Sequence, residues 1–159
     1  DIYQLDSDVQ LWCDALLLES IVKEAKRLSN ENPHIFHLWY QATQLTYGEF
    51  LPGLDRDWIV RKRNYYQQLS IDAWMGLADY HRYHEDYRSA LSAYQQIESF
   101  APHHEASYRA RMECYSALGE IASISLTYKA LEQRLARDLQ IQPSEQSHRL
   151  YKRLISSAS

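Results

Sequence analysis

Apolar residues recur every three or four positions along most of this 159-residue chain, which is the spacing of amphipathic helices. The first stripe covers residues 7–28 and ends at the turn residues around Pro33, which cannot continue a helix. Further helices are predicted over residues 36–48 and from 58 to about 83. Because Gly and Pro number only 4 each, and no run of β-branched residues indicates a sheet, the pattern predicts an all-α fold.

The clearest pattern is a repeat that begins at Trp74. Residues 74–102 fit the tetratricopeptide spacing W-x2-L-G-x2-Y…A-x3-F…P, with Pro102 at its last position. Adding one repeat length of 34 places large side chains at most corresponding positions: Tyr108, Met112, Tyr115, Tyr128 and Leu131. Ile124 stands where the first unit has the small Ala90. Gly119 falls at the turn between the two helices of the second unit, where a left-handed C-cap is expected.

The C-terminal part continues the helical pattern and then closes it. Residues 121–139 carry an apolar seam at spacings of three and four, and Pro143 breaks that helix. A last amphipathic helix places Leu150, Tyr151 and Leu154 against the end of the stack, as a capping helix would. The sequence therefore predicts a tetratricopeptide-like antiparallel helical repeat array with a C-terminal capping helix.

Charge and composition narrow the classes of partner. The formal net charge of −4 provides no bulk attraction to nucleic acid or to an anionic membrane. The longest apolar run, residues 15–18, is far too short to span a bilayer, and the chain begins with no signal-peptide pattern. Cys13 and Cys114 are isolated and lack the spacing of metal ligands. These features favour a cytoplasmic protein in a reducing compartment.

Catalytic and metal-binding chemistry has little support in the sequence. The pairs His34-x-x-His37 and His81-x-x-His84 each place two imidazoles on one helical face, but neither has evident third and fourth ligands. Neither a G-x-S-x-G motif, an H-E-x-x-H motif nor a P-loop occurs. We therefore expect no catalytic residue, no metal and no cofactor, and the chain is not predicted to be an enzyme.

The triplet Arg61-Lys62-Arg63 is the candidate for a secondary contact with phosphate groups. Consecutive residues spread around a helix, however, so the three cations do not share one face. Asp55 and Asp57 also offset them. A solvated face or intramolecular ion pairs are the favoured interpretation, and a contact with nucleic acid remains the alternative.

A repeat array has one further functional surface, the concave face lined by the first helix of each unit. The positions predicted on that face are Asp72, Met75, Asp79, Arg82, Tyr83, Arg109 and Glu113. Mixed charge with Met and Tyr suits a peptide or helix better than DNA. The alternative is that this face packs against neighbouring helices of the same chain.

One stretch resembles a known family. The segment Tyr47-Gly48-Glu49-Phe50-Leu51-Pro52-Gly53-Leu54, followed by Trp58-Ile59-Val60 and Arg63, is similar to the bacterial transcriptional activator domain. That family occurs in antibiotic-pathway regulators of actinobacteria and in larger bacterial activators. The matches D-Y-x-x-A-L at residues 86–91, P-x-x-E at 102–105 and P-S at 143–144 follow in order, so the resemblance covers about residues 8–156. Glu85 and Gln140 stand where the family usually has Gly, and Ile124 where it has Ala.

The resemblance implies a regulatory domain over residues 7–156. Residues 1–6 would be the tail of a preceding winged-helix domain that binds DNA, and residues 157–159 a disordered tail. The implied function is that of an effector domain of a transcription activator, which makes protein contacts by dimerisation or with the transcription machinery. A small-molecule-sensing domain and a generic repeat adaptor unrelated to transcription are the alternatives. The connector at 47–54 is predicted to be a joint held to the core by Leu51, Leu54 and Trp58.

Overall fold

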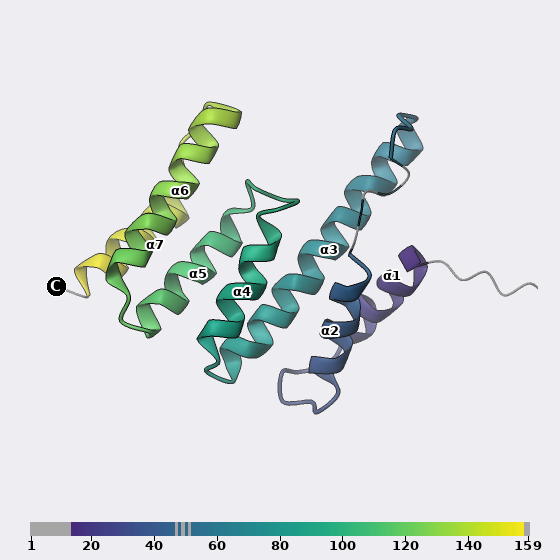
Figure 1. Cartoon of the computed structure of the whole chain (residues 1–159), viewed down its shortest axis with the longest axis horizontal. Helices are drawn as coiled ribbons and strands as arrows, with labels where there is room; N and C mark the ends of the chain where they lie inside the picture. Colours follow the sequence, from purple (N-terminus) through teal and green to yellow (C-terminus); the bar gives the residue numbers. More distant parts are fainter. Residues whose placement is uncertain (1–13, 47, 49, 51, 158–159) are drawn as a thin grey trace, which may run out of the picture.

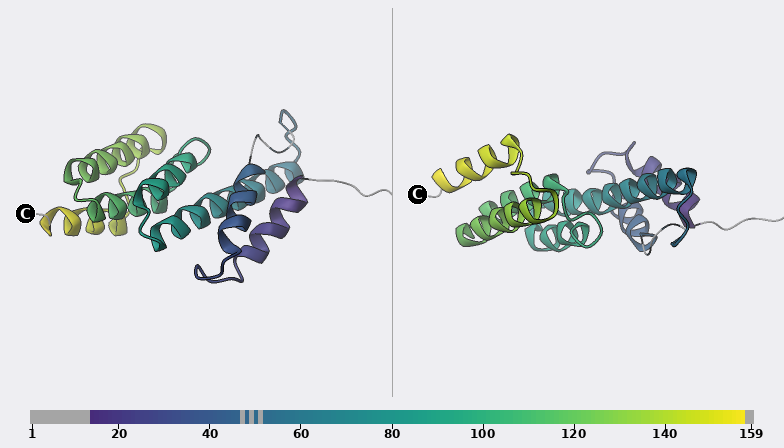
Figure 2. Two further views of the ribbon diagram at one scale, coloured as in Figure 1. Left: turned by 60° about the horizontal axis from the view of Figure 1, so that its bottom comes forward. Right: turned by 90° about the horizontal axis from the view of Figure 1, so that it is seen from above.

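The computed structural model describes residues 14–46, 48, 50 and 52–157, and within them the secondary structure is entirely α-helical. The helices are α1 (Asp14–Ala25), α2 (Ile35–Gln44), α3 (Asp57–Tyr83), α4 (Tyr87–Ile97), α5 (Glu105–Ala117), α6 (Ile121–Leu139) and α7 (Glu145–Ser156). They stand side by side in chain order, with α1 and α7 at opposite ends (Figure 1). The two further views show the same order from α1 in purple to α7 in yellow (Figure 2).

Each helix from α1 to α6 packs on the next one along the chain, and α7 packs on both α5 and α6. Consecutive helices joined by short connections pack antiparallel, as in other helical repeat arrays. The all-α, tetratricopeptide-like fold with a terminal capping helix is therefore confirmed. Of the segments predicted around it, residues 1–6 lie outside the described residues, as does Cys13. Of the predicted tail 157–159, only Ser157 is described, as the C-cap of α7.

Helix α3 forms the centre of the larger core because α1, α2 and α4 all pack on it. Ala78 and Ala90 are completely buried where α3 meets α4, and their short side chains let the two helices approach closely. Trp39 of α2 lies directly over Gly76, where a Cβ atom would come within 2.3 Å of the indole ring. Gly76 therefore sits inside a helix despite its cost in backbone entropy, because only glycine leaves room for Trp39.

A second core joins α5, α6 and α7. Met112 and Ile124 are completely buried in it, together with Tyr128 and Leu150. The rings of Tyr128 and Tyr151 stack with their centroids 4.3 Å apart. Ile124, which replaces the small residue of the first repeat unit, is thus a core side chain in this unit. α7 is held by burial of one apolar stripe, as predicted for a capping helix.

Two turns adopt left-handed geometry without glycine. Gly119 has φ of 72°, as expected from its position between the helices of a repeat. Glu85 has φ of 60° and Gln140 has φ of 56°, in the same region of backbone space. These are the two positions where the family that the sequence resembles usually has Gly. The turns are therefore preserved at a strain cost of about 1 kcal/mol for each residue.

The connector before α3 differs from the expectation. Leu54 is 51% exposed and Trp58 is 50% exposed, so the prediction that they hold this joint to the core is wrong, and Leu51 lies outside the described residues. The helix begins at Asp57, so Trp58 lies on the outer face of its first turn. Ile59, which is 2% exposed, takes the inner face instead. The neighbour of Ile59 one turn later, Arg63, is the residue that holds the connector.

Arg63 donates hydrogen bonds from Nε to the carbonyl oxygen of Phe50 at 3.4 Å and from Nη2 to that of Leu54 at 3.1 Å. The Phe50 ring packs on Tyr66, with centroids 4.8 Å apart. The connector is therefore a joint, as predicted, but a polar side chain and one aromatic contact hold it.

Among the described residues, none of the helices has both the length and the apolar content needed to cross a lipid bilayer.

Candidate functional site

An open groove of about 750 Å³ lies between α3, α5 and α7. Its lining comprises Met75, Asp79, Arg82, Ala106, Arg109, Ala110, Glu113, Glu145, Gln146, Arg149, Leu150 and Arg153. Five of the seven residues predicted on the concave face are among them: Met75, Asp79, Arg82, Arg109 and Glu113. The first helices of the repeat units thus meet at one surface, as their position in the repeat indicates.

Asp72 and Tyr83 are not part of the groove lining. The Asp72 carboxylate accepts a hydrogen bond from Lys26 Nζ at 2.6 Å, because the end of α1 reaches this turn of α3. Tyr83 donates its hydroxyl proton to Glu31 Oε1 at 3.0 Å, in the connection between α1 and α2. Spacing alone placed these residues on the same face as the others. The packing of the first two helices directs both of them toward the N-terminal side of the array.

Charged side chains of α3 and α5 form a hydrogen-bonded network along the groove. Arg82 donates to Glu113 Oε2 at 3.0 Å and to Asp79 Oδ1 at 3.3 Å. Asp79 Oδ1 also accepts the hydroxyl proton of Tyr94, which is completely buried. Burial, and then the charge of Asp79, raise the pKa of Tyr94 far above its ordinary value. The phenol therefore stays protonated and donates to the carboxylate throughout the physiological pH range.

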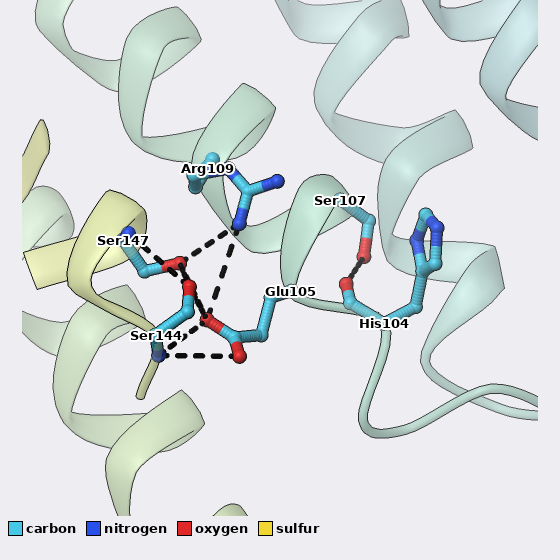
Figure 3. A network of polar contacts seen from close by, with 6 residues as sticks. All are labelled: His104, Glu105, Ser107, Arg109, Ser144 and Ser147. Carbon is cyan, nitrogen blue, oxygen red and sulfur yellow. Dashed lines mark hydrogen bonds and ion pairs between the residues drawn. The ribbon is translucent and has the colours of Figure 1, made fainter. Parts of the chain in front are cut away.

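A second network fixes α7 against α5 (Figure 3). Glu105 Oε2 accepts hydrogen bonds from Ser144 Oγ at 2.7 Å and from the completely buried Ser147 Oγ at 2.6 Å. The backbone N–H of Ser144 is also directed at the two carboxylate oxygens, at 3.2 and 3.0 Å. Arg109 Nη1 lies 3.0 Å from Ser147 Oγ and 3.9 Å from Glu105 Oε2. One carboxylate therefore holds the start of α7 and orients an arginine of the groove.

The pKa of Glu105 reflects this environment. Partial burial raises it, but the hydrogen bonds from Ser147 and Ser144 and the charge of Arg109 outweigh burial and lower it below its ordinary value. Glu105 is therefore ionised at neutral pH, which strengthens each of its hydrogen bonds. These contacts also give a structural role to two of the sequence matches, P-x-x-E at 102–105 and P-S at 143–144.

Helix α7 contributes a wall of the groove, although its sequence pattern predicted only a capping helix. Glu145, Arg149 and Arg153 follow one another at intervals of four residues and so lie on one face of α7. Arg149 Nε donates to Glu145 Oε1 at 2.6 Å. The recurrence of these charges opposite the apolar stripe is the sequence pattern that could have indicated this second face of the helix. Because a capping helix buries only one face, its opposite face can line the groove.

The basic triplet does not form a common surface. Arg63 is engaged by the connector and by Asp55, whose Oδ1 lies 3.5 Å from its Nη1. Lys62 Nζ lies 5.5 Å from the ring centroid of Tyr65, and Arg61 is exposed. Two of the three cations thus have partners in the chain. Any contact with phosphate groups would depend on Arg61 and Lys62.

His81 and the described cysteine have ordinary packing roles. His81 Nδ1 lies 3.2 Å from Asp86 Oδ2, and its ring packs edge-on against Phe36 at 5.8 Å. Within the described residues, no three His, Cys, Asp or Glu side chains are grouped so that they could hold a metal ion. Burial raises the pKa of the Cys114 thiol to about 11. It therefore stays protonated and unreactive at neutral pH.

Comparison with known proteins bears on this architecture directly. A family model described as the bacterial transcriptional activator domain matches residues 13–155, which is nearly the whole chain. Searches of curated proteins and of solved structures give no match. The matched range includes the connector, the two core clusters described above and the three helices that line the groove.

Proposed function

The chain belongs to the bacterial transcriptional activator domain family, and from this we propose that it is the protein-contact module of a bacterial transcription activator. The family consists of regulatory domains rather than enzymes. In this proposal, DNA is bound by a domain outside the chain, and the chain engages either a second activator molecule or the transcription machinery. Its net charge of −4 is in keeping with that division of roles.

The observation that carries the proposal is the open, charged groove between α3, α5 and α7. A pocket for a small effector is usually enclosed and mostly apolar, with a few convergent polar groups. This groove is open to solvent, and most of its lining side chains are charged or polar. Exposed side chains from three helices of a repeat array suit a peptide or helix of a partner protein. The groove therefore supports protein contact better than it supports sensing of a small molecule.

The proposal can be tested without knowledge of the target genes. The chain is fused to an unrelated DNA-binding domain whose operator stands upstream of a reporter gene in a bacterial host. Both operator occupancy and transcription are measured. We expect the fusion to raise transcription above that given by the DNA-binding domain alone. A rise in occupancy without a rise in transcription would indicate dimerisation as the contact that the chain makes.

The role of the groove is tested by filling it. Ala106 lines the groove with a short side chain, so Ala106→Trp obstructs it without removing any hydrogen bond. Ala122→Trp, at an exposed position of α6 outside the groove lining, is the matched control. We expect Ala106→Trp to abolish the effect of the fusion and Ala122→Trp to preserve it. An inactive wild-type fusion, or an active Ala106→Trp fusion, would contradict the proposal.

A further inference from the structure

The charges that line the groove are unlike those of the chain as a whole, which carries a net charge of −4. The arginines of the lining are Arg82, Arg109, Arg149 and Arg153, and its acidic residues are Asp79, Glu113 and Glu145. The lining therefore holds one more arginine than acidic side chains, on a protein that is negative overall. How these groups are paired decides which of them are available to a partner.

Asp79 and Glu113, two of the acidic residues of the lining, are hydrogen-bonded to donors within the chain. Arg82 lies between Asp79 and Glu113 and makes hydrogen bonds to both, at 3.3 and 3.0 Å. Tyr94 supplies a further donor to Asp79. Because these carboxylates have their donors within the chain, they offer little attraction to a cationic partner.

The arginines on the α7 side of the groove keep donor groups available. Arg149 uses Nε for Glu145, its side chain is 76% exposed, and its terminal nitrogens are left for other acceptors. Arg153, one turn further along α7, makes no ion pair with any residue that the structure describes. Arg109 directs one end of its guanidinium at Ser147 and Glu105 and the other end away from them (Figure 3). Planar guanidinium groups bind carboxylates with two parallel hydrogen bonds.

Between the charged walls, the floor of the groove is apolar and shallow. Ala106 and Ala110 lie one turn apart on α5, so only methyl groups project at these two positions, with Arg109 and Glu113 of the same helix beside them. Met75 and Leu150 border them, and Leu150 is 8% exposed. A partner with an apolar side chain between its charges could therefore bury that side chain against these residues.

We propose that the groove binds an acidic peptide segment, with carboxylates that pair with Arg109, Arg149 and Arg153 and an apolar residue that packs on Ala106 and Ala110. This inference rests on the proposed function, because it names the chemistry of the partner for the same groove. A peptide can place its carboxylates only opposite the arginines. A nucleic acid, whose phosphates are continuous along its backbone, would also bring negative charge against Glu113 and Glu145.

The test is fluorescence anisotropy with a dye-labelled peptide of alternating glutamate, leucine and aspartate residues. A second peptide with glutamine and asparagine in place of the acidic residues is the uncharged control. We expect the acidic peptide to bind and the control peptide not to bind. Binding of the acidic peptide should weaken as salt is added, because salt screens exposed charge pairs. Equal binding of both peptides, or of neither, would overturn the inference.

Two neighbouring residues of α7 provide a matched pair of variants. Arg153 lines the groove, whereas Lys152 is also exposed but is not part of the lining. Arg153→Glu is expected to weaken binding of the acidic peptide on the order of tenfold, and Lys152→Glu to have a much smaller effect. Equal effects of the two variants would overturn the inference, because binding would then follow net charge rather than the groove.

The peptide assay and the fusion assay separate the two proposals. A fusion that activates transcription while the acidic peptide fails to bind would overturn the inference and leave the proposed function intact. If the fusion bound the acidic peptide but raised neither operator occupancy nor transcription, the inference would be supported and the proposed function contradicted. A labelled single-stranded oligonucleotide that binds more tightly than the peptide, with the same loss in Arg153→Glu, would overturn the choice of a peptide as the partner.

Discussion

The connector before α3 and the junction of α5 with α7 are both joints of the array, but they are built from opposite kinds of side chain. The first contains Pro, Gly and large apolar residues, and yet Leu54 and Trp58 are half exposed. The second depends on small polar residues, and Ser147 is completely buried in it. In the connector a cation donates to backbone carbonyls, whereas at the α5–α7 junction an anion accepts from hydroxyl and N–H groups.

The difference shows that a conspicuous residue in the sequence need not be one that holds the fold together. A large apolar side chain stabilises only as much as its surface is removed from water. A charged hydrogen-bond acceptor that is surrounded by donors contributes more than a neutral one. The groove wall on α7 is consequently positioned by Glu105, and the connector only has to lead the chain into α3.

The largest expected effect distinguishes two tryptophans. Trp39 is 6% exposed and packs on Gly76, whereas Trp58 is 50% exposed on the connector side of α3. We expect Trp39→Ala to lower the free energy of unfolding by about 4 kcal/mol and Trp58→Ala by less than about 1 kcal/mol. Urea denaturation followed by circular dichroism measures both. Losses of similar size would place Trp58 in the core and contradict the described connector.

The two joints can be compared by removing the charged residue of each. Glu105→Gln keeps the size of the side chain but removes its charge and one acceptor, and we expect a loss of about 2 kcal/mol in unfolding free energy. Arg63→Met removes the donors to the connector, and we expect a loss of about 1 kcal/mol. Glu145→Gln, in an exposed ion pair on the same helix as Ser147, is the control and should change stability little. A larger loss for Arg63→Met than for Glu105→Gln would reverse the comparison.

Acid should weaken the α5–α7 junction in a predictable direction. The pKa of Glu105 in the folded protein is lowered from its ordinary value of 4.5, because hydrogen bonds from the serines and the charge of Arg109 outweigh partial burial. The contribution of ionised Glu105 to the free energy of unfolding is therefore complete above about pH 4.5. It is lost as the pH falls through the lower pKa of the folded state.

The difference in unfolding free energy between the wild type and Glu105→Gln should accordingly decrease as the pH is lowered below 4.5. Denaturant titrations of both proteins at a series of pH values measure this difference. A difference that stays constant into acid would mean that the charge of Glu105 does not contribute to the junction.

The smallest expected effects are gains. Glu85 and Gln140 occupy left-handed turns, so Glu85→Gly and Gln140→Gly should each raise the free energy of unfolding by about 0.5–1 kcal/mol. Glu85→Ala and Gln140→Ala keep the strain and should bring no gain. The two sites are in different turns, so their effects should add. If alanine stabilised as much as glycine, backbone strain would not be the cause.

The sequence by itself determined the helices, their order and the surface that α3 and α5 contribute to the groove. Spacings of three and four residues are a local property, so the repeat from Trp74 and the turn at Gly119 could be predicted without knowledge of any tertiary contact. Because first helices of successive units face the same side, Met75, Asp79 and Arg109 could also be placed on one surface.

Only the tertiary structure decided what those residues contact. Local spacing does not show that α1 would engage Asp72, that Tyr83 would turn toward Glu31, or that α7 would become a wall of the groove. The contact of Glu105 with Ser144 joins residues 39 positions apart, and no helical period links them. A repeat pattern specifies which face of each helix is buried, but the packing of the ends of the array determines which charges remain for a partner.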